Sequence, residues 1–133
     1  MLLIHSFKYT IIWGLIILFF CLVNFNSGNS ESIFADLLFF DKIIHLFIFF
    51  VFSILLLIDL KNLYQKLSRK HYLITFFLSF FYALLTELMQ KNFTSYRSFE
   101  WYDILADVLG IILALILFKL NRAFFLEKLI NNK

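Results

Sequence analysis

The sequence predicts an all-α membrane protein, a four-transmembrane-helix bundle with N- and C-termini both cytoplasmic. Three observations support this fold class: 62% of the 133 residues are hydrophobic, only 16% are charged, and there is no proline. A soluble domain of this length needs more polar surface to cover its core. A bilayer-spanning helix needs about 20 mostly apolar residues. Four spans with short loops therefore account for nearly the whole chain, which predicts a single membrane domain over residues 1–133.

The apolar runs place the four spans at about residues 9–23, 43–58, 72–89 and 101–120. Each run is expected to be a helix, because a helix pairs its own backbone amides and an unpaired amide in lipid costs several kcal/mol. The alternation that marks a transmembrane β-strand is absent from these runs. No cleavage motif of small residues follows the first run, so we expect it to be retained as a span.

The distribution of basic residues over the predicted loops sets the orientation. With the N-terminus inside, nine Lys and Arg residues lie on the cytoplasmic side and three lie outside, and the opposite topology reverses these numbers. Most acidic residues fall on or near the outer side, so the two faces differ in charge. The nine inner basic residues are Lys8, Lys61, Lys66, Arg69, Lys70, Lys119, Arg122, Lys128 and Lys133, and the three outer ones are Lys42, Lys91 and Arg97.

Three groups of polar residues occupy helix ends, and under this topology all three reach the outer side. An ionised side chain deep in lipid costs about 2.5–3.5 kcal/mol, so we expect these groups to face the bundle interior. Intramembrane ionisable residues are candidates for a functional site by default. The predicted functional cluster is Asp41-Lys42-x-x-His45, Glu87-x-x-Gln90 and Arg97-x-x-Glu100-x-x-Asp103-x-x-x-Asp107-x-x-Gly110.

The spacing within these groups places their members on common helix faces. Asp41 and His45 are four residues apart, so they share one face. Asp103, Asp107 and Gly110 follow at intervals of four and three, which predicts one stripe along the fourth span. A glycine on such a stripe allows a neighbouring helix to approach closely. The polar groups of the second, third and fourth spans are thus predicted to meet.

These motifs resemble the VanZ-like family of bacterial membrane proteins, whose founding member is associated with low-level teicoplanin resistance. The resemblance covers a VanZ-like core of about residues 41–118. The family pattern usually has asparagine where this chain has Asp107, an isosteric but ionisable replacement. The resemblance implies a multi-pass protein of the bacterial cytoplasmic (inner) membrane and cell envelope. It rests on the Asp41-Lys42-x-x-His45 motif, on Thr86-Glu87-Leu88-Met89-Gln90, on Arg97 and on Asp103-Ile104-Leu105-Ala106-Asp107-Val108-Leu109-Gly110.

Three functions are compatible with the outer cluster. The first is a non-enzymatic envelope protein that binds a cell-wall precursor or lipid carrier and modulates glycopeptide (teicoplanin-type) susceptibility, with Lys42 and Arg97 contacting phosphate. The second is a membrane-embedded enzyme acting on a lipid-linked substrate, with His45 as general base. The third is a small proton-coupled carrier acting as an oligomer, in which His45 and Asp107 relay protons.

The sequence favours the first of these functions. There is no H-E-x-x-H or comparable ligand spacing, so no metal and no cofactor are predicted. Neither Cys21 nor Ser53 is placed beside the cluster to act as a nucleophile, so no catalytic residue is assigned. The short basic loop at residues 61–71 is attributed to topology, so nucleic acid is not an expected partner. The expected partners are membrane lipid and an envelope ligand, and a homo-oligomer is left open.

Overall fold

The computed structural model describes residues 6–22, 34–93 and 100–131, and these residues form four helices and no strand. In chain order the helices are α2 (Lys8–Leu22), α3 (Phe34–Tyr64), α4 (Arg69–Phe93) and α5 (Trp101–Asn131). The all-helical prediction is confirmed for this part of the chain. Each helix includes most or all of one predicted span, but α3, α4 and α5 extend beyond their apolar runs. Polar residues that flank an apolar run can continue its helix, because adding a residue to a helix that has already formed is favourable.

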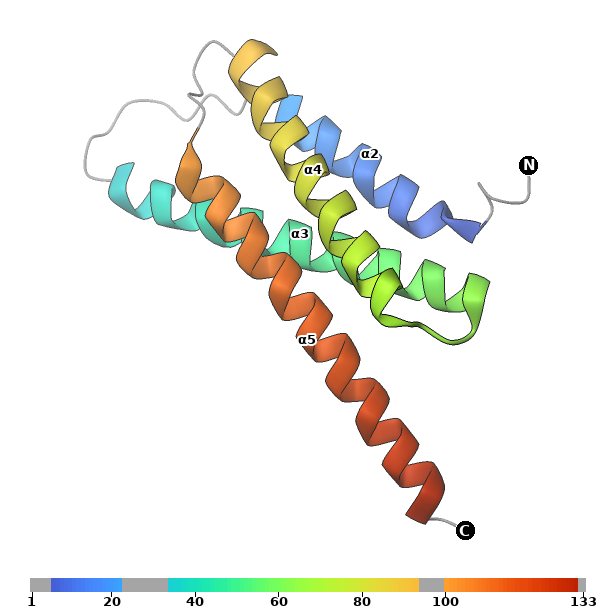
Figure 1. The fold of residues 1–133 in the computed structure, drawn as a ribbon. Helices are drawn as coiled ribbons and strands as arrows, with labels where there is room; N and C mark the ends of the chain where they lie inside the picture. The colour runs from blue at the N-terminus through green and yellow to red at the C-terminus, as the bar shows by residue number, and fades with distance from the viewer. Residues whose placement is uncertain (1–5, 23–33, 94–99, 132–133) are drawn as a thin grey trace.

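The four helices form a bundle with two distinct ends (Figure 1). The starts of α3 and α5 and the end of α4 lie together, and we call this the cluster end. The start of α2 and the connection between α3 and α4 lie at the other end, which we call the turn end. The C-terminal half of α5 extends away from α4, past the turn end. The three predicted polar groups are therefore on segments that meet at one end of the bundle.

The connection between α3 and α4 is short because both helices are capped locally. Gln65 has a φ of 55°, in the left-handed region, and its N–H donates to the carbonyl of Lys61 at 2.7 Å, which ends α3. Ser68 precedes α4, and its backbone N–H donates to Nδ1 of His71 at 2.9 Å. The His71 N–H in turn donates to the carbonyl of Ser68 at 3.0 Å. The His71 side chain thus caps the N–H of Ser68 as the glutamate of a capping box does, whereas the His71 N–H bonds to the Ser68 carbonyl and not to its hydroxyl.

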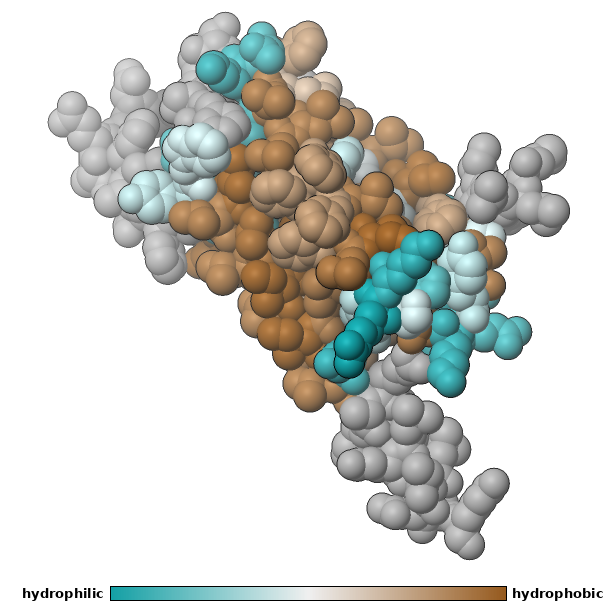
Figure 2. Space-filling view, in the orientation of Figure 1, coloured by the Kyte–Doolittle hydropathy of each residue, from teal (hydrophilic) through white to brown (hydrophobic). Residues whose placement is uncertain are grey.

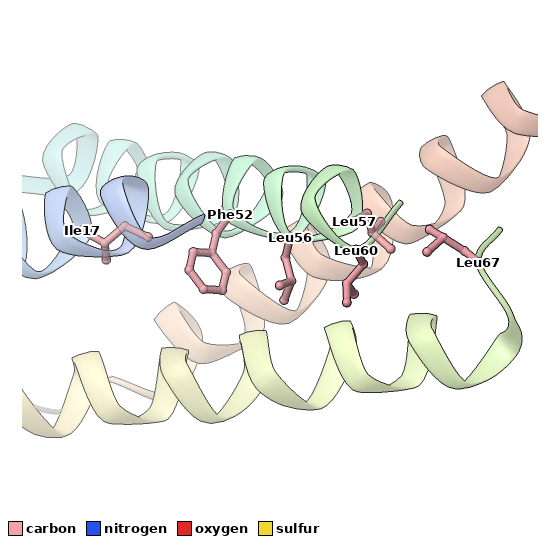
Figure 3. Packing of buried hydrophobic residues seen from close by; sticks show 6 residues of the cluster. All are labelled: Ile17, Phe52, Leu56, Leu57, Leu60 and Leu67. Atoms are coloured by element: carbon pink, nitrogen blue, oxygen red, sulfur yellow. The ribbon is translucent and has the colours of Figure 1, made fainter. Parts of the chain in front are cut away.

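A hydrophobic cluster fills the space between α3 and its neighbours (Figure 3). Helix α3 makes its most extensive contact with α5 and also packs on α2 and α4. Phe52 of α3 stacks on Tyr82 of α4 with ring centroids 5.0 Å apart, and the Tyr82 hydroxyl donates to the carbonyl of Gly14 at 2.6 Å. Tyr82 thus connects α2, α3 and α4. The buried members are Ile17, Phe52, Leu56, Leu57, Leu60 and Leu67.

Helix α4 is inverted relative to a helix of a soluble protein. Its buried face carries small and polar residues, while Phe77, Phe81 and Leu88 are about half or more exposed. Lipid tails are as apolar as leucine, so small residues rather than large hydrophobic ones favour close helix contact in a membrane. Figure 2 shows hydrophobic residues covering the middle of the visible surface and hydrophilic ones towards its ends. The buried residues of α4 are Thr75, Ser79, Ala83, Thr86, Glu87 and Gln90.

Two described helices are long and apolar enough to cross a membrane. They are Phe40–Tyr64 with a mean hydropathy of 2.7 and Arg69–Phe93 with a mean hydropathy of 1.7. Lys8–Phe20 is apolar but shorter. By length and composition, these two helices are of the kind found in membrane proteins. The four-span topology, the orientation of the termini and the single-domain boundaries remain predictions.

Candidate functional site

The site begins with a close approach of α3 and α5 at Gly110. A Cβ added to this buried glycine would lie 2.2 Å from the carbonyl oxygen of Leu46 and 3.1 Å from the backbone nitrogen of Phe50. Any larger residue would therefore collide with the α3 backbone. Leu46 follows His45, and Gly110 is one turn after Asp107. The contact brings these two polar residues of different helices together, as the glycine in the predicted stripe suggested.

Lys42 joins the start of α3 to the start of α5. Its Nζ lies 3.0 Å from Oε2 of Glu100 and 2.9 Å from Oδ1 of Asp103. Asp103 is buried, whereas Lys42 and Glu100 are partly exposed. A lysine between two carboxylates satisfies a charge that would otherwise be costly to bury. Lys42 therefore holds α5 against α3, and its ammonium group is already engaged.

His45 lies between carboxylates from two other helices. Its Nδ1 is 3.0 Å from Oδ1 of Asp107 on α5, a hydrogen-bond distance, and its Nε2 is 3.8 Å from Oε1 of Glu87 on α4. The imidazole and both carboxylates are buried, with Asp107 at 0% and Glu87 at 1% exposed. A carboxylate on one ring nitrogen fixes the tautomer and the orientation of the ring. The other nitrogen, Nε2, is then the one left for a proton, a metal or a substrate.

Asp107 has one carboxylate oxygen that the described protein leaves without a hydrogen bond. Oδ1 is bonded to His45, but the buried Oδ2 has no partner among the described residues. An unsatisfied buried oxygen of this kind is rare in proteins and costs about 1–3 kcal/mol. Oδ1 of Asp59, a buried aspartate at the turn end, is also without a partner among the described residues, so this feature is not confined to the cluster.

The remaining predicted members lie around this centre. Donor atoms of Asp41, His45 and Asp103 all lie within 4.8 Å of one another, and Asp41 is partly exposed. Gln90 is buried at 4% exposure, on the same α4 face as Glu87. Arg97 lies outside the described residues. The structure therefore brings together all predicted cluster residues that it describes, although their role in function remains a prediction.

A second buried carboxylate, at the turn end, was not singled out by the sequence. Asp59 is 1% exposed, and its Oδ2 accepts hydrogen bonds from the backbone N–H of Thr10 at 3.1 Å and from its Oγ1 at 2.7 Å. Thr10 is in the first turn of α2, where backbone N–H groups lack helical partners. In the sequence, Asp59 is simply the charged residue that follows the predicted span at residues 43–58. The available signal was that it follows the unbroken apolar run Ile54–Ile58 and precedes Leu60.

A family model described as VanZ/LLP1 matches residues 6–124 of the chain. The chain belongs to the VanZ/LLP1 family. The match includes all four helices in whole or in part and every residue of the cluster. Membership associates this VanZ/LLP1 protein with teicoplanin-resistance-related membrane proteins. No curated protein and no solved structure matches the chain significantly.

The geometry gives this VanZ/LLP1 protein the elements of acid–base chemistry and of ligand binding. A buried histidine oriented by one carboxylate and facing a second is an arrangement that can take up and release a proton. Carboxylate and imidazole donors also suit divalent cations. These groups lie at one end of a bundle with many exposed hydrophobic side chains.

Proposed function

We propose that this VanZ/LLP1 protein crosses the bacterial inner membrane four times with both termini in the cytoplasm. The cluster end then faces the outside and binds the polar head of a lipid-linked envelope ligand. By binding this ligand the protein alters susceptibility to teicoplanin-type glycopeptides. The orientation is supported by the basic residues, nine on the proposed cytoplasmic side against three on the outer side. The family membership supports the link to teicoplanin.

One observation carries the proposal. His45, Glu87 and Asp107 are buried together at the end of a bundle whose outer surface is hydrophobic. Burying ionisable groups is costly, and in membrane proteins they mark pathways and ligand sites. To hold α3 against α5, Lys42 needs only its two partners, Glu100 and Asp103. The described cluster has three further carboxyl groups. The excess is explained if the cluster recognises a polar group that arrives from outside the protein.

The engaged state of Lys42 refines how a head group is recognised. Its ammonium is shared by Glu100 and Asp103, and Glu100 is the more exposed of these two partners. A phosphate reaching Lys42 would displace Glu100 more easily than the buried Asp103. Lys42 would then bind the phosphate in place of its present partner Glu100. A phosphate contact through Arg97, which lies outside the described residues, remains a prediction.

The test combines a cellular and a purified readout. Teicoplanin susceptibility is measured in a bacterial host expressing the wild type, H45A or the matched control H71A, which replaces a half-buried histidine at the turn end. Purified protein is tested for binding to vesicles containing a polyprenyl phosphate and to vesicles of phosphatidylglycerol alone. We expect H45A, but not H71A, to abolish the susceptibility change and the preference for polyprenyl phosphate. Unchanged behaviour of H45A on both readouts would overturn the proposal.

The orientation is tested separately by cysteine labelling in a background with Cys21 replaced by serine. A cysteine at Gln65, in the α3–α4 turn, should react only after the inner membrane is permeabilised. A cysteine at Trp101, which is 69% exposed at the cluster end, should react in intact spheroplasts. The reverse labelling pattern would place the cluster in the cytoplasm and refute the external site.

A second candidate is a membrane-embedded enzyme acting on a lipid-linked substrate. The hydrogen bond between His45 and Asp107 favours it, because an imidazole oriented by a carboxylate is a common general base. Turnover of a radiolabelled polyprenyl-linked substrate by purified protein, abolished in H45A, supports this function. Binding of the same lipid without any turnover supports the first candidate instead.

A further inference from the structure

Three side chains at the cluster end form a set of metal donors that the sequence did not reveal. Asp41 and His45 project from one face of α3, and Asp103 comes from the start of α5. One donor atom of each lies within 4.8 Å of the other two. No contiguous ligand motif marks this set, because its members come from two helices separated by about 60 positions in the sequence. That separation explains why the sequence alone predicts no metal.

The spacing of these atoms is close to what one cation requires. First-row divalent cations hold nitrogen and oxygen donors at about 2.0–2.2 Å, so donors at the tetrahedral angle lie about 3.4 Å apart and only opposite donors reach about 4.4 Å. The three donor atoms lie within 4.8 Å of one another, so a tetrahedral site needs them to close by up to about 1.4 Å. Asp41 is partly exposed and can make this adjustment by changing rotamer, whereas His45 and Asp103 are buried and fixed.

The surroundings of His45 form the outer shell of such a site. Metal-binding histidines almost always donate their second ring nitrogen to a carboxylate or carbonyl. Nδ1 of His45 has such a partner in Oδ1 of Asp107 at 3.0 Å, and Nε2 lies 3.8 Å from Oε1 of Glu87, so a cation on Nε2 would lie beside Glu87 as well. With a cation on its second ring nitrogen, His45 would lie between a carboxylate and the metal, as metal-binding histidines commonly do.

A second and independent observation is the uncompensated negative charge. Asp107 is 0% exposed, and its Oδ2 has no partner among the described residues. The described part of the cluster has five carboxyl groups, and its one ammonium group, on Lys42, is already bonded to two of them. A buried carboxylate without a counter-charge is strongly disfavoured. Among the described residues of the cluster, the other source of positive charge is a protonated His45, and a divalent cation on that imidazole would supply more.

We propose that Asp41, His45 and Asp103 bind one divalent transition-metal cation of the Mn²⁺ or Zn²⁺ class. Imidazole nitrogen suits zinc and its neighbours, carboxylate oxygen suits manganese, and a mixed set suits both. Three protein donors leave coordination positions open. An open position takes water or an anionic oxygen, so the cation can bridge the protein to a phosphate head group. The head-group part rests on the proposed function, and the cation site itself does not.

The cation site is tested by titrating purified full-length protein in detergent micelles with Mn²⁺ and following the spectroscopic signal of free Mn²⁺. We expect one saturable site per chain, which Zn²⁺ competes for. D103N and H45Q should each weaken binding by at least about tenfold. The matched control is D59N, which removes a buried carboxylate of α3 at the turn end, 1% exposed in the wild type. It should bind Mn²⁺ as the wild type does.

Helix content by circular dichroism and size-exclusion behaviour establish that each variant is folded. If D103N and H45Q do not fold, D41N decides the question, because Asp41 is partly exposed and its replacement leaves the buried pairs in place. The proposal is overturned if wild-type protein shows no saturable Mn²⁺ or Zn²⁺ binding, or if D41N binds as tightly as D59N.

The head-group part has its own measurement. Vesicles containing polyprenyl phosphate are titrated with protein in Mn²⁺ and again in EDTA. Bridging predicts that EDTA weakens binding at least about tenfold and that D41N in Mn²⁺ behaves like the wild type in EDTA. Binding that is insensitive to EDTA refutes bridging and leaves the proposed ligand function standing. Cation binding without any lipid binding refutes the proposed function and leaves the cation site standing.

Discussion

The two ends of the bundle each contain a buried aspartate on or against α3, yet the two are used differently. At the turn end, Asp59 accepts two hydrogen bonds from Thr10 through one oxygen. At the cluster end, Asp107 accepts from His45, which also faces Glu87. A single carboxylate is enough to fasten one helix start to another helix. The cluster end has carboxylates from three helices around one imidazole, more than fastening requires.

Under the proposed function, this difference separates residues that stabilise the fold from residues that also form the ligand site. Variants at the turn end should change the free energy of unfolding and leave ligand binding intact. Variants at the cluster end should change both, because the same groups hold the helices and form the site. The variants below are ordered by the size of the effect that this comparison predicts.

The largest effect is expected for G110A. A Cβ at this position would lie 2.2 Å from the carbonyl oxygen of Leu46, so α3 and α5 must separate. Overpacking of this kind costs about 1–3 kcal/mol, and collision with backbone places it at the upper end. We expect a loss of about 3 kcal/mol in the free energy of unfolding in mixed detergent micelles. The teicoplanin phenotype should be lost as well, since His45 and Asp107 move apart.

Gly14 provides the matched control for this variant. A Cβ there would lie 3.5 Å from a ring carbon of Phe52 and from the hydroxyl of Tyr82, which is ordinary contact. G14A should therefore change the unfolding free energy by less than about 0.5 kcal/mol. Equal destabilisation by G14A and G110A would show that glycine is needed only for helix contact in general and not for the cluster end in particular.

An intermediate effect is expected for D107L. Leucine cannot accept from Nδ1 of His45, which leaves a buried nitrogen unsatisfied, at a cost of about 2 kcal/mol. D107N keeps an oxygen that can accept this hydrogen bond and should lose less than about 1 kcal/mol. Unfolding in mixed micelles and teicoplanin susceptibility measure the two variants together. If D107N is as damaging as D107L, the negative charge rather than the hydrogen bond is what position 107 supplies.

The helical architecture could be predicted from the sequence because it depends on local properties. Long apolar runs without proline give helices, and α2 begins and ends within one residue of its predicted span. The ends of the other helices were missed for a physical reason. Lys61 and Lys91, for example, are polar but good helix formers, so α3 and α4 continue through them.

The cluster was predictable only as a set of residues. Helical spacing placed Asp103 and Asp107 on one stripe, and that stripe does face α3. Which groups pair could not be derived, because partner choice depends on the crossing of α3 and α5 at Gly110. Lys42 was expected to meet a phosphate but lies between two acids. Asp59 was missed because its partner, Thr10, is 49 residues away and ordinary in the sequence.

The smallest effect is expected for T10V at the turn end. Valine has the shape of threonine but cannot donate to Oδ2 of Asp59, whereas the backbone N–H at position 10 still can. Loss of one hydrogen bond should lower the unfolding free energy by about 1 kcal/mol. In a double-mutant cycle, D59L should make T10V nearly neutral, because leucine cannot accept the hydrogen bond that T10V also removes. Teicoplanin susceptibility should equal that of the wild type. A change in susceptibility with T10V would mean that the start of α2 also shapes the site, and the division between a structural and a functional end would fail.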